Sequence, residues 1–301
     1  RRGRGPGGRP LASRMLAPHM PLAAAFYALA AIALWATLAS LGTALTHVPP
    51  FLLTGAALII GSVPSWPLAW RDRRAWRVPA GTLALGVYGL FGFHFLLFIA
   101  LRHAPPVEAN LVNYLWPLFI VVLAPLLLPG MRLRPLHVVA ALLGFAGAAV
   151  AILGARGVAD VAQAERWGFI PAVGSALIWA TYSLGTRRVA WFPTSAVGLF
   201  GLVSGVLSLA CHVLLEPAAQ LSARDWGLVV LCGLGPLGGA FYLWDIALKR
   251  GDARQIGILS YITPLAATAL LVAVTGCALS PCIAWAAVMI IVAAVLGTRA
   301  R

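Results

Sequence analysis

Long apolar runs separated by short charged breaks constrain this chain more than any other feature. A helix needs about 20 apolar residues to cross the ~30 Å hydrocarbon core of a bilayer, and runs of that length recur from one end of the sequence to the other. Of the 301 residues, 61% are hydrophobic and only 10% are charged, which leaves more apolar surface than a soluble protein of this size can bury. We therefore expect an all-α polytopic membrane protein.

The runs predict ten transmembrane helices joined by connections too short to hold a soluble domain. These helices are expected at residues 21–41, 48–70, 79–101, 106–128, 135–154, 168–188, 194–216, 226–248, 255–275 and 281–298. A basic segment rich in Arg, Gly and Pro precedes the first of them and resembles the start of a signal peptide. Because further spans follow, we expect an uncleaved first helix and a disordered segment at 1–20.

The basic residues are distributed unevenly between the two sides of this arrangement. The net charge of +14 would suit a nucleic-acid partner if these residues formed one patch. Instead they lie in short loops and near the chain ends, with 18 of the 22 Lys and Arg on one side of the membrane and 4 on the other. Since basic loops stay cytoplasmic, we predict a multi-pass protein of a bacterial-type inner (plasma) membrane. Both termini are expected in the cytoplasm, with the lipid bilayer as partner and no nucleic-acid partner.

Three short segments of the first half recur in the second half at offsets of 144 or 147 residues. The pairs are Ala33–Thr37 with Leu177–Thr181, Asn113–Pro117 with Ser260–Pro264, and Ala100–Arg102 with Ala247–Lys249. A half with five spans ends on the opposite side of the membrane from its start, so the two copies must be inverted. Two inverted five-helix repeats, at 21–154 and 167–301 with an outer linker at 155–166, are the layout of secondary transporters. No oligomeric state follows from the sequence, which is compatible with a monomer.

Polar and aromatic side chains interrupt the fourth apolar run. Asn110, Asn113, Tyr114 and Trp116 stand where a lipid-facing helix would carry only aliphatic residues. Polar groups at bilayer depth are costly unless they face other helices or water. Pro117 also removes one backbone hydrogen bond from this helix. The run is therefore predicted to form one wall of a solute pathway.

Other spans are expected to place aromatic groups near the same depth, at a rise of ~1.5 Å per residue. The candidate substrate-binding residues are His94, Asn110, Asn113, Tyr114, Trp116, Trp179, Trp35 and Tyr182. Aromatic walls suit an aromatic side chain, while amides and imidazole can bond a carboxylate and an ammonium group. Each residue taken alone also fits a packing role between helices.

The ten spans in two inverted halves resemble the drug/metabolite transporter superfamily of the EamA-repeat kind. Within it, Gly92–Phe95 and Ala100–Pro117 resemble the YddG-type aromatic amino-acid exporters. This resemblance implies export of aromatic amino acids and related metabolites from the cytoplasm, and we expect alternating access with a small-molecule substrate and no cofactor. A broad-specificity drug/metabolite exporter is the alternative within the same superfamily.

An intramembrane enzyme and a channel are the alternatives from other classes. Val203–Gly205 loosely resembles an intramembrane serine protease motif, but Leu202 stands where that motif has glycine. No H-E-x-x-H zinc pair occurs in the sequence, and inverted repeats are not needed for a channel. We expect no enzymatic activity, no catalytic residue and no metal site.

The remaining polar positions have structural interpretations. Asp245 precedes Lys249 by four residues, which predicts an ion pair at the cytoplasmic end of the eighth span. With that carboxylate paired, we expect facilitated diffusion. The glycines of 233–238 and the Gly201/Gly205 pair are interpreted as close packing of helices. Cys277 and Cys282 flank the last outer turn, where a disulfide is one outcome.

Overall fold

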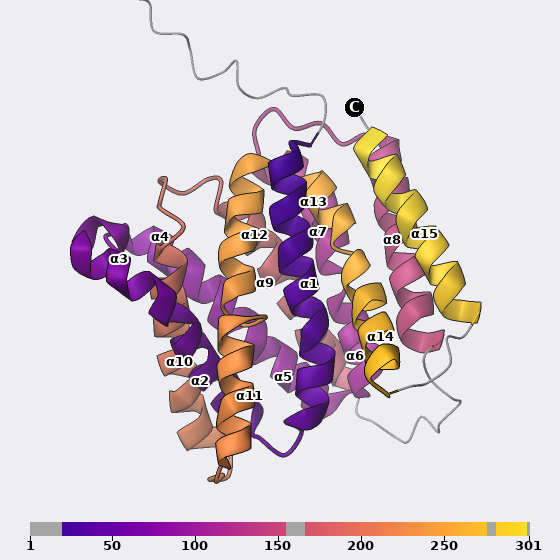
Figure 1. The fold of residues 1–301 in the computed structure, drawn as a ribbon. Coiled ribbons are helices and arrows are strands. Elements are labelled where there is room, and N and C mark those ends of the chain that lie inside the picture. Colours follow the sequence, from indigo (N-terminus) through magenta and orange to yellow (C-terminus); the bar gives the residue numbers. More distant parts are fainter. Residues whose placement is uncertain (1–19, 155–165, 276–280, 300–301) are drawn as a thin grey trace, which may run out of the picture.

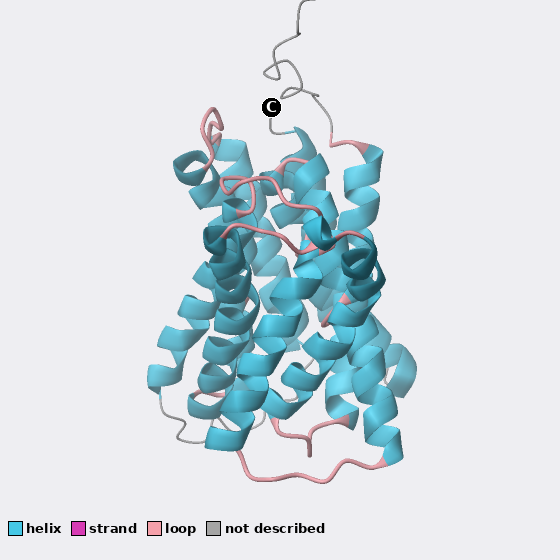
Figure 2. Cartoon of the chain, turned by 90° about the vertical axis from the view of Figure 1, so that its left-hand side faces the viewer, coloured by secondary structure: helices cyan, strands magenta, loops and turns pink. Residues whose placement is uncertain are grey.

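The computed structural model describes residues 20–154, 166–275 and 281–299. Within these ranges the secondary structure is helical, without strands (Figure 2). Seven helices are long and apolar enough to cross a membrane: Leu22–Ala44, Pro50–Arg71, Ala80–His103, Glu108–Leu127, Pro135–Leu153, Ala196–Leu215 and Ala223–Arg250. Shorter apolar helices cover Phe169–Gly185 and Pro281–Gly297. The expected all-α, multi-span architecture is confirmed at this level.

Several apolar runs contain more than one helix. The α-helices are α1 (Leu22–Ala44), α2 (Pro50–Ser62), α3 (Trp66–Arg71), α4 (Ala80–Val87), α5 (Phe93–His103), α6 (Pro106–Asn113), α7 (Trp116–Leu127), α8 (Pro135–Gly154), α9 (Phe169–Gly185), α10 (Ala196–Leu215), α11 (Ala223–Leu234), α12 (Gly239–Arg250), α13 (Ala253–Leu259), α14 (Ile262–Thr275) and α15 (Pro281–Arg299). Short 3₁₀ turns occupy η2 (Val63–Ser65), η3 (Arg73–Ala75) and η5 (Arg166–Gly168), and η4 (Tyr88–Gly92) is a π-helical turn.

The helices form one bundle with α1 across its middle (Figure 1). On one flank α8 packs along α15, and on the other α2 packs along α10. Between these flanks α1 contacts α12 and α14, and α9 contacts α5 and α7. Helices from distant parts of the sequence therefore meet at the centre of the bundle.

The fourth run breaks at the sequence motif that is repeated in the two halves. Helix α6 ends at Asn113 and α7 begins at Trp116, with Pro117 in its first turn. The matching motif behaves in the same way, since α13 ends at Leu259 and α14 begins at Ile262. A proline in a first helical turn loses no hydrogen bond, so these prolines favour a new helix start after a turn. The predicted proline irregularity is confirmed in the fourth run.

Glycines at the break between α11 and α12 permit a close helix approach. The turn contains Pro236, and Gly61 of α2 lies against it. A Cβ added to Gly61 would stand 2.7 Å from both Gly233 O and Gly238 Cα. A second close contact joins α2 to α10, where a Cβ on Gly205 would stand 2.8 Å from Gly55 O. The packing interpretation of both glycine patterns is confirmed.

The π-helical turn η4 was not predicted from the sequence. It inserts an extra residue into the helical turn before His94, and such bulges re-aim the side chains that follow. Two glycines leave room for neighbouring rings, because a Cβ on Gly86 would collide with Phe200 and one on Gly89 with Tyr182. The turn thus brings α9 and α10 close to the third run.

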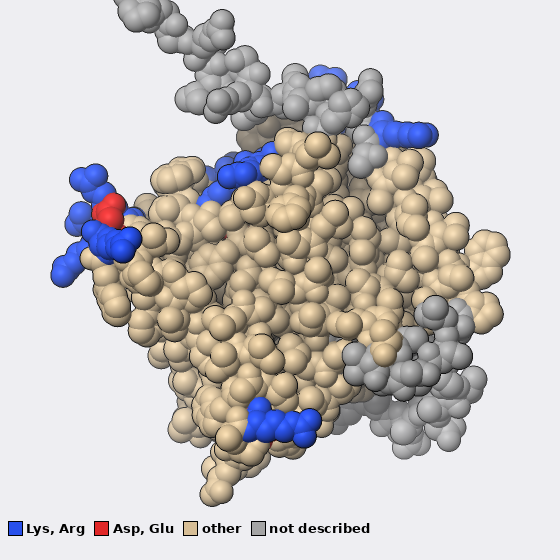
Figure 3. Space-filling model, in the orientation of Figure 1, with Lys and Arg blue, Asp and Glu red and all other residues tan. Residues whose placement is uncertain are grey.

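Charged side chains lie toward the ends and flank of the bundle. Figure 3 shows Lys and Arg at the two ends of the visible face and at one flank, with an uncharged band between them. Exposed large apolar residues are numerous, among them Phe26, Ile170 and Val213. An apolar belt between basic ends is the surface expected of a protein embedded in a bilayer.

Candidate functional site

Four tryptophans from four separate helices meet at the centre of the bundle. Trp35 of α1 lies 5.8 Å from Trp179 of α9 and 5.2 Å from Trp244 of α12, measured between ring centroids. Trp116 of α7 lies 5.6 Å from Trp244, edge to face. Such pairs contribute about 0.5–1.5 kcal/mol beyond the burial of their area. The structure therefore brings Trp35, Trp116 and Trp179 together, as the sequence predicted.

Further rings extend this cluster around Trp179. Phe93 and Tyr182 each lie 5.3 Å from it, and Phe241 lies 5.6 Å from it, measured between ring centroids. The ring of His94 in turn lies 6.2 Å from that of Phe241. We call the whole set the aromatic layer: Trp35, Phe93, His94, Trp116, Trp179, Tyr182, Phe241 and Trp244.

The imidazole of His94 has one hydrogen-bond partner within its own helix. Its Nδ1 lies 2.6 Å from the carbonyl oxygen of Leu90 in the π-helical turn, and the side chain is buried. A carbonyl oxygen only accepts, so Nδ1 carries the hydrogen. In the neutral ring Nε2 is then an acceptor. It can receive a hydrogen bond from an ammonium or hydroxyl group.

Asn113 is buried and linked to α9. Ser175 Oγ lies 2.8 Å from Asn113 Oδ1 and also 2.8 Å from the carbonyl oxygen of Ala172. The hydroxyl has one hydrogen and donates to one of these oxygens at a time. The amide of Asn113 thus joins α6 to α9, next to the break that leads to Trp116.

Asn110 and Tyr114 lie at the edge of this region. Both are half-buried, and Tyr114 occupies the turn between α6 and α7. Neither belongs to the ring contacts of the aromatic layer as defined above. Of the eight predicted site residues, the structure therefore gathers five in the layer, links Asn113 to α9, and places Asn110 and Tyr114 beside them.

Phe93, Phe241 and Trp244 belong to the layer and were missed by the sequence reasoning. The repeat offset of 147 residues pairs His94 with position 241, so it would have pointed to Phe241. Trp244 follows three residues later on the same helical face. Nothing in the sequence singles out Phe93 among the phenylalanines around it.

The predicted ion pair between Asp245 and Lys249 is confirmed, and it is more buried than a pair at the headgroups. Asp245 Oδ2 lies 2.6 Å from Lys249 Nζ and accepts a 2.6 Å hydrogen bond from Thr194 Oγ1. Lys249 Nζ also donates to the carbonyl of Phe192 and lies 4.0 Å from the centre of its ring. The pair ties α12 to the segment between α9 and α10, one residue beyond Trp244.

A second buried carboxylate, Glu216, was not predicted. It lies just after α10, and Phe51 N at the start of α2 donates to it at 3.0 Å. Arg102 Nη2 and His212 Nδ1 lie 2.9 and 3.0 Å from its two oxygens. We call these residues the Glu216 cluster. A carboxylate at a helix N-terminus is favoured by the helix dipole, and this one joins α2, α5 and α10.

The rings of the layer are closely packed. Trp244 is 1% exposed and Trp179 is 3% exposed. A cavity of about 10 Å³ borders Phe241, Leu90 and Tyr242, enough for about one water molecule. A solute at this level must therefore displace rings of the layer.

Comparison with known proteins decides the family. The chain matches the EamA-like transporter family twice, over residues 22–153 and 166–299. The chain belongs to the EamA-like transporter family. Its helices and apolar belt are those of a multi-pass inner-membrane transporter.

Individual relatives agree with this membership. The chain is 44% identical over 272 residues to the aromatic amino acid exporter YddG of Ancylobacter novellus, a match that covers 89% of this chain and 94% of the relative. It is 28% identical over 187 residues to the inner membrane transporter YhbE of Escherichia coli, covering 61% and 57%. A solved crystal structure shares 41% identity with a TM-score of 0.84, covering 91% of this chain and 96% of the other.

Proposed function

We propose that this EamA-like transporter exports aromatic amino acids and related metabolites from the cytoplasm by alternating access. The aromatic layer carries this proposal. Its first three large rings, Trp35, Phe93 and Trp116, fall in the first match to the family, and Trp179, Phe241 and Trp244 fall in the second. The name of the Ancylobacter novellus relative supports the choice of substrate class.

The described helices can be grouped into ten spans. This count takes α2–α3, α4–α5, α6–α7, α11–α12 and α13–α14 as one broken span each. Five spans then lie in the repeat at 21–154 and five in the repeat at 167–301, with the linker at 155–166. An odd number of spans makes the repeats inverted, and the distribution of basic residues orients both termini toward the cytoplasm.

In the proposed mechanism the aromatic layer is the barrier between the two sides. The ring of a substrate replaces contacts between tryptophans as the layer parts, so the barrier is exchanged for binding at a small net change in free energy. His94 Nε2 and the amide of Asn113 can bond the ammonium and carboxylate groups of the substrate. Neither group presents a fixed charge, which favours weak binding and release.

Polar contacts on either side of the layer hold it closed. The Glu216 cluster joins α2, α5 and α10 at one end. The pair of Asp245 and Lys249 joins α12 to the α9–α10 connection toward the other. Opening to one side requires one set to loosen while the other stays formed. Because Asp245 already has a cationic partner, the export runs down the substrate gradient without a coupled proton.

Uptake of a radiolabelled panel into proteoliposomes tests the substrate class. Tryptophan, tyrosine and phenylalanine should enter faster than leucine, glutamate or a cationic dye, and should be recovered chemically unchanged. Equal rates for the dye and for phenylalanine would favour the broad-specificity drug/metabolite exporter. A chemically altered solute would favour an intramembrane enzyme.

A further inference from the structure

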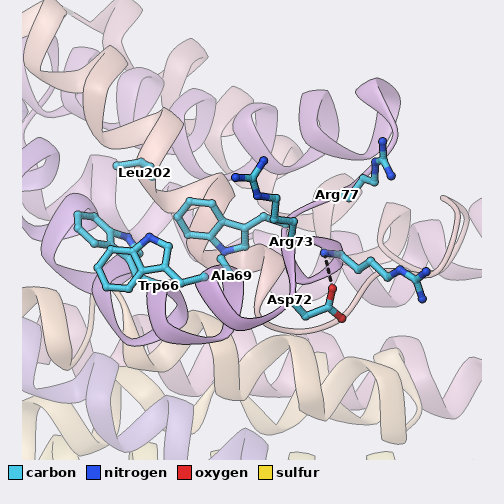
Figure 4. Close-up of a pocket in the computed structure, with 9 residues that line it drawn as sticks. Trp66, Ala69, Asp72, Arg73, Arg77 and Leu202 are labelled. Atoms are coloured by element: carbon cyan, nitrogen blue, oxygen red, sulfur yellow. Dashed lines mark hydrogen bonds between the residues drawn. The ribbon is translucent and has the colours of Figure 1, made fainter.

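A pocket of about 810 Å³ lies away from the aromatic layer, at the segment that follows α2. Its walls are three tryptophans, three arginines and three other residues: Trp66, Trp70, Trp76, Arg73, Arg74, Arg77, Ala69, Asp72 and Leu202. Trp66 and Leu202 lie at one end of it and Arg77 at the other (Figure 4). Its volume falls in the range of small-molecule sites, about 300–1,000 Å³.

The walls of this pocket are fixed to the bundle by hydrogen bonds. Trp76 Nε1 lies 3.2 Å from Ser65 Oγ and 3.2 Å from the carbonyl of Ser195, at the start of α10. Ser195 Oγ donates back to the carbonyl of Ala75 at 3.1 Å. Trp66 Nε1 donates to Ser62 Oγ at 3.0 Å. The segment is therefore a built part of the structure.

The chemistry of the pocket combines positive charge with a large apolar surface. Three arginines face one acid, Asp72, whose Oδ1 accepts from Arg74 N. Trp70 is 79% exposed and Leu68, beside it on α3, is 54% exposed. Helix α3 projects from the flank of the bundle, where a basic cluster is visible (Figures 1 and 3). Tryptophan and arginine together are typical of the bilayer interface.

We propose that this pocket binds the headgroup and upper acyl region of an anionic phospholipid. Arginine guanidinium groups bond phosphate oxygens in a fixed fork geometry, and the exposed indoles cover the chain below the phosphate. The lipid comes from the leaflet on the side of the basic loops. A soluble phosphate compound would satisfy the arginines, but it would leave Trp66 and Trp70 without a role.

Lipid retention by the purified protein tests the site. The protein is reconstituted in equal amounts of phosphatidylglycerol and phosphatidylcholine and purified again in detergent, and the retained lipids are quantified by mass spectrometry. The wild type should be enriched in phosphatidylglycerol. The variant Arg73→Gln/Arg77→Gln should lose about fivefold of this enrichment per arginine removed.

The matched control is Arg132→Gln/Arg134→Gln, in which two exposed arginines of another basic loop are changed. It should retain phosphatidylglycerol as the wild type does. Equal losses in the two double variants would overturn the proposal, because diffuse charge would explain both. Displacement of the lipid by soluble glycerol phosphate at equal concentration would also overturn it.

A variant of unchanged charge decides the case independently of any effect of charge on insertion. Trp70→Ala removes an exposed wall of the pocket and leaves every arginine in place. It should retain clearly less phosphatidylglycerol than the wild type. Retention at the wild-type level would show that the indole wall takes no part in binding and would contradict the pocket as the site.

Discussion

Phe241 and Trp244 stand on one face of α12 and reach the tryptophans of three other helices. At the scale of single residues, the site is therefore a set of ring contacts in which each ring touches several others. Removal of a ring from such a core costs about 3–5 kcal/mol for a change to alanine, so a smaller change is needed to separate transport from folding.

Trp244→Phe is the change that tests the layer most gently. It keeps an aromatic ring and removes part of the contact with Trp35 and Trp116, so we expect normal purification and a several-fold slower uptake of aromatic amino acids. Trp285→Phe is the control, because Trp285 is 68% exposed on α15. Equal uptake rates for the two variants would place the pathway elsewhere.

The role of Asn113 can be separated from its bond to α9. Asn113→Leu keeps the volume and removes the amide, whereas Ser175→Ala removes only the partner hydroxyl. If the amide bonds the substrate, Asn113→Leu slows uptake several-fold and Ser175→Ala changes it little. Similar losses in both variants would assign Asn113 to helix packing alone.

Single carboxylates connect whole elements in this molecule. Glu216 accepts from the first N–H groups of α2 and pairs with Arg102 of α5, and its side chain is fully buried. Glu216→Gln leaves the arginine without a charged partner, so we expect the stability of the purified protein to fall by about 1–3 kcal/mol. Thermal unfolding in detergent measures this change. Asp72→Asn, at an exposed position, should shift the midpoint far less; an equal shift would contradict the account.

A third carboxylate, Asp252, caps α13 in the connection after α12. Burial alone would raise its pKa, but the hydrogen bonds and charge of Arg254 outweigh burial and hold the pKa below its ordinary value. A depressed carboxyl pKa stabilises the fold above the unfolded pKa of about 3.9. The excess stability of the wild type over Asp252→Asn should thus be present at pH 7 and vanish as the pH falls below that value. A difference that is independent of pH would contradict this.

The elements show how far the sequence was informative. Pro117 and the glycines at 233–238 indicated irregular helices, and breaks occur at both places, because prolines and glycines act on the local backbone. The π-helical turn at Tyr88–Gly92 was missed, since its cause is the packing of Phe200 and Tyr182 against two glycines. Glu216 was missed for the same reason: its partners lie 114 and 165 residues away along the chain.

The candidate site followed a similar pattern. Trp35, Trp116 and Trp179 were predicted because each stands inside an apolar run, and ring contacts join all three. Depth along a helix says nothing about which way a side chain points, so Tyr114 was grouped with them although it is not part of the layer. The predicted pairing of Cys282 involves Cys277, which lies outside the described residues.

At the scale of the whole molecule, the ten-span arrangement predicts which loops face the cytoplasm. With the native cysteines replaced by serine, cysteines at Arg73 and Arg188 should react with an impermeant reagent only from the cytoplasmic side. One at Ala218, in the exposed connection between α10 and α11, should react only from outside. Labelling of all three from one side would contradict the span count and the orientation.

The central claim is that an aromatic solute crosses between the two halves of the molecule by alternating access. Counterflow in sealed proteoliposomes tests it most directly: vesicles loaded with unlabelled phenylalanine are diluted into a trace of labelled phenylalanine. A carrier predicts a transient accumulation of label above equilibrium, absent from vesicles loaded with leucine and reduced in Trp244→Phe. Equilibration of the label without an overshoot would show that internal substrate does not accelerate entry, and would contradict alternating access.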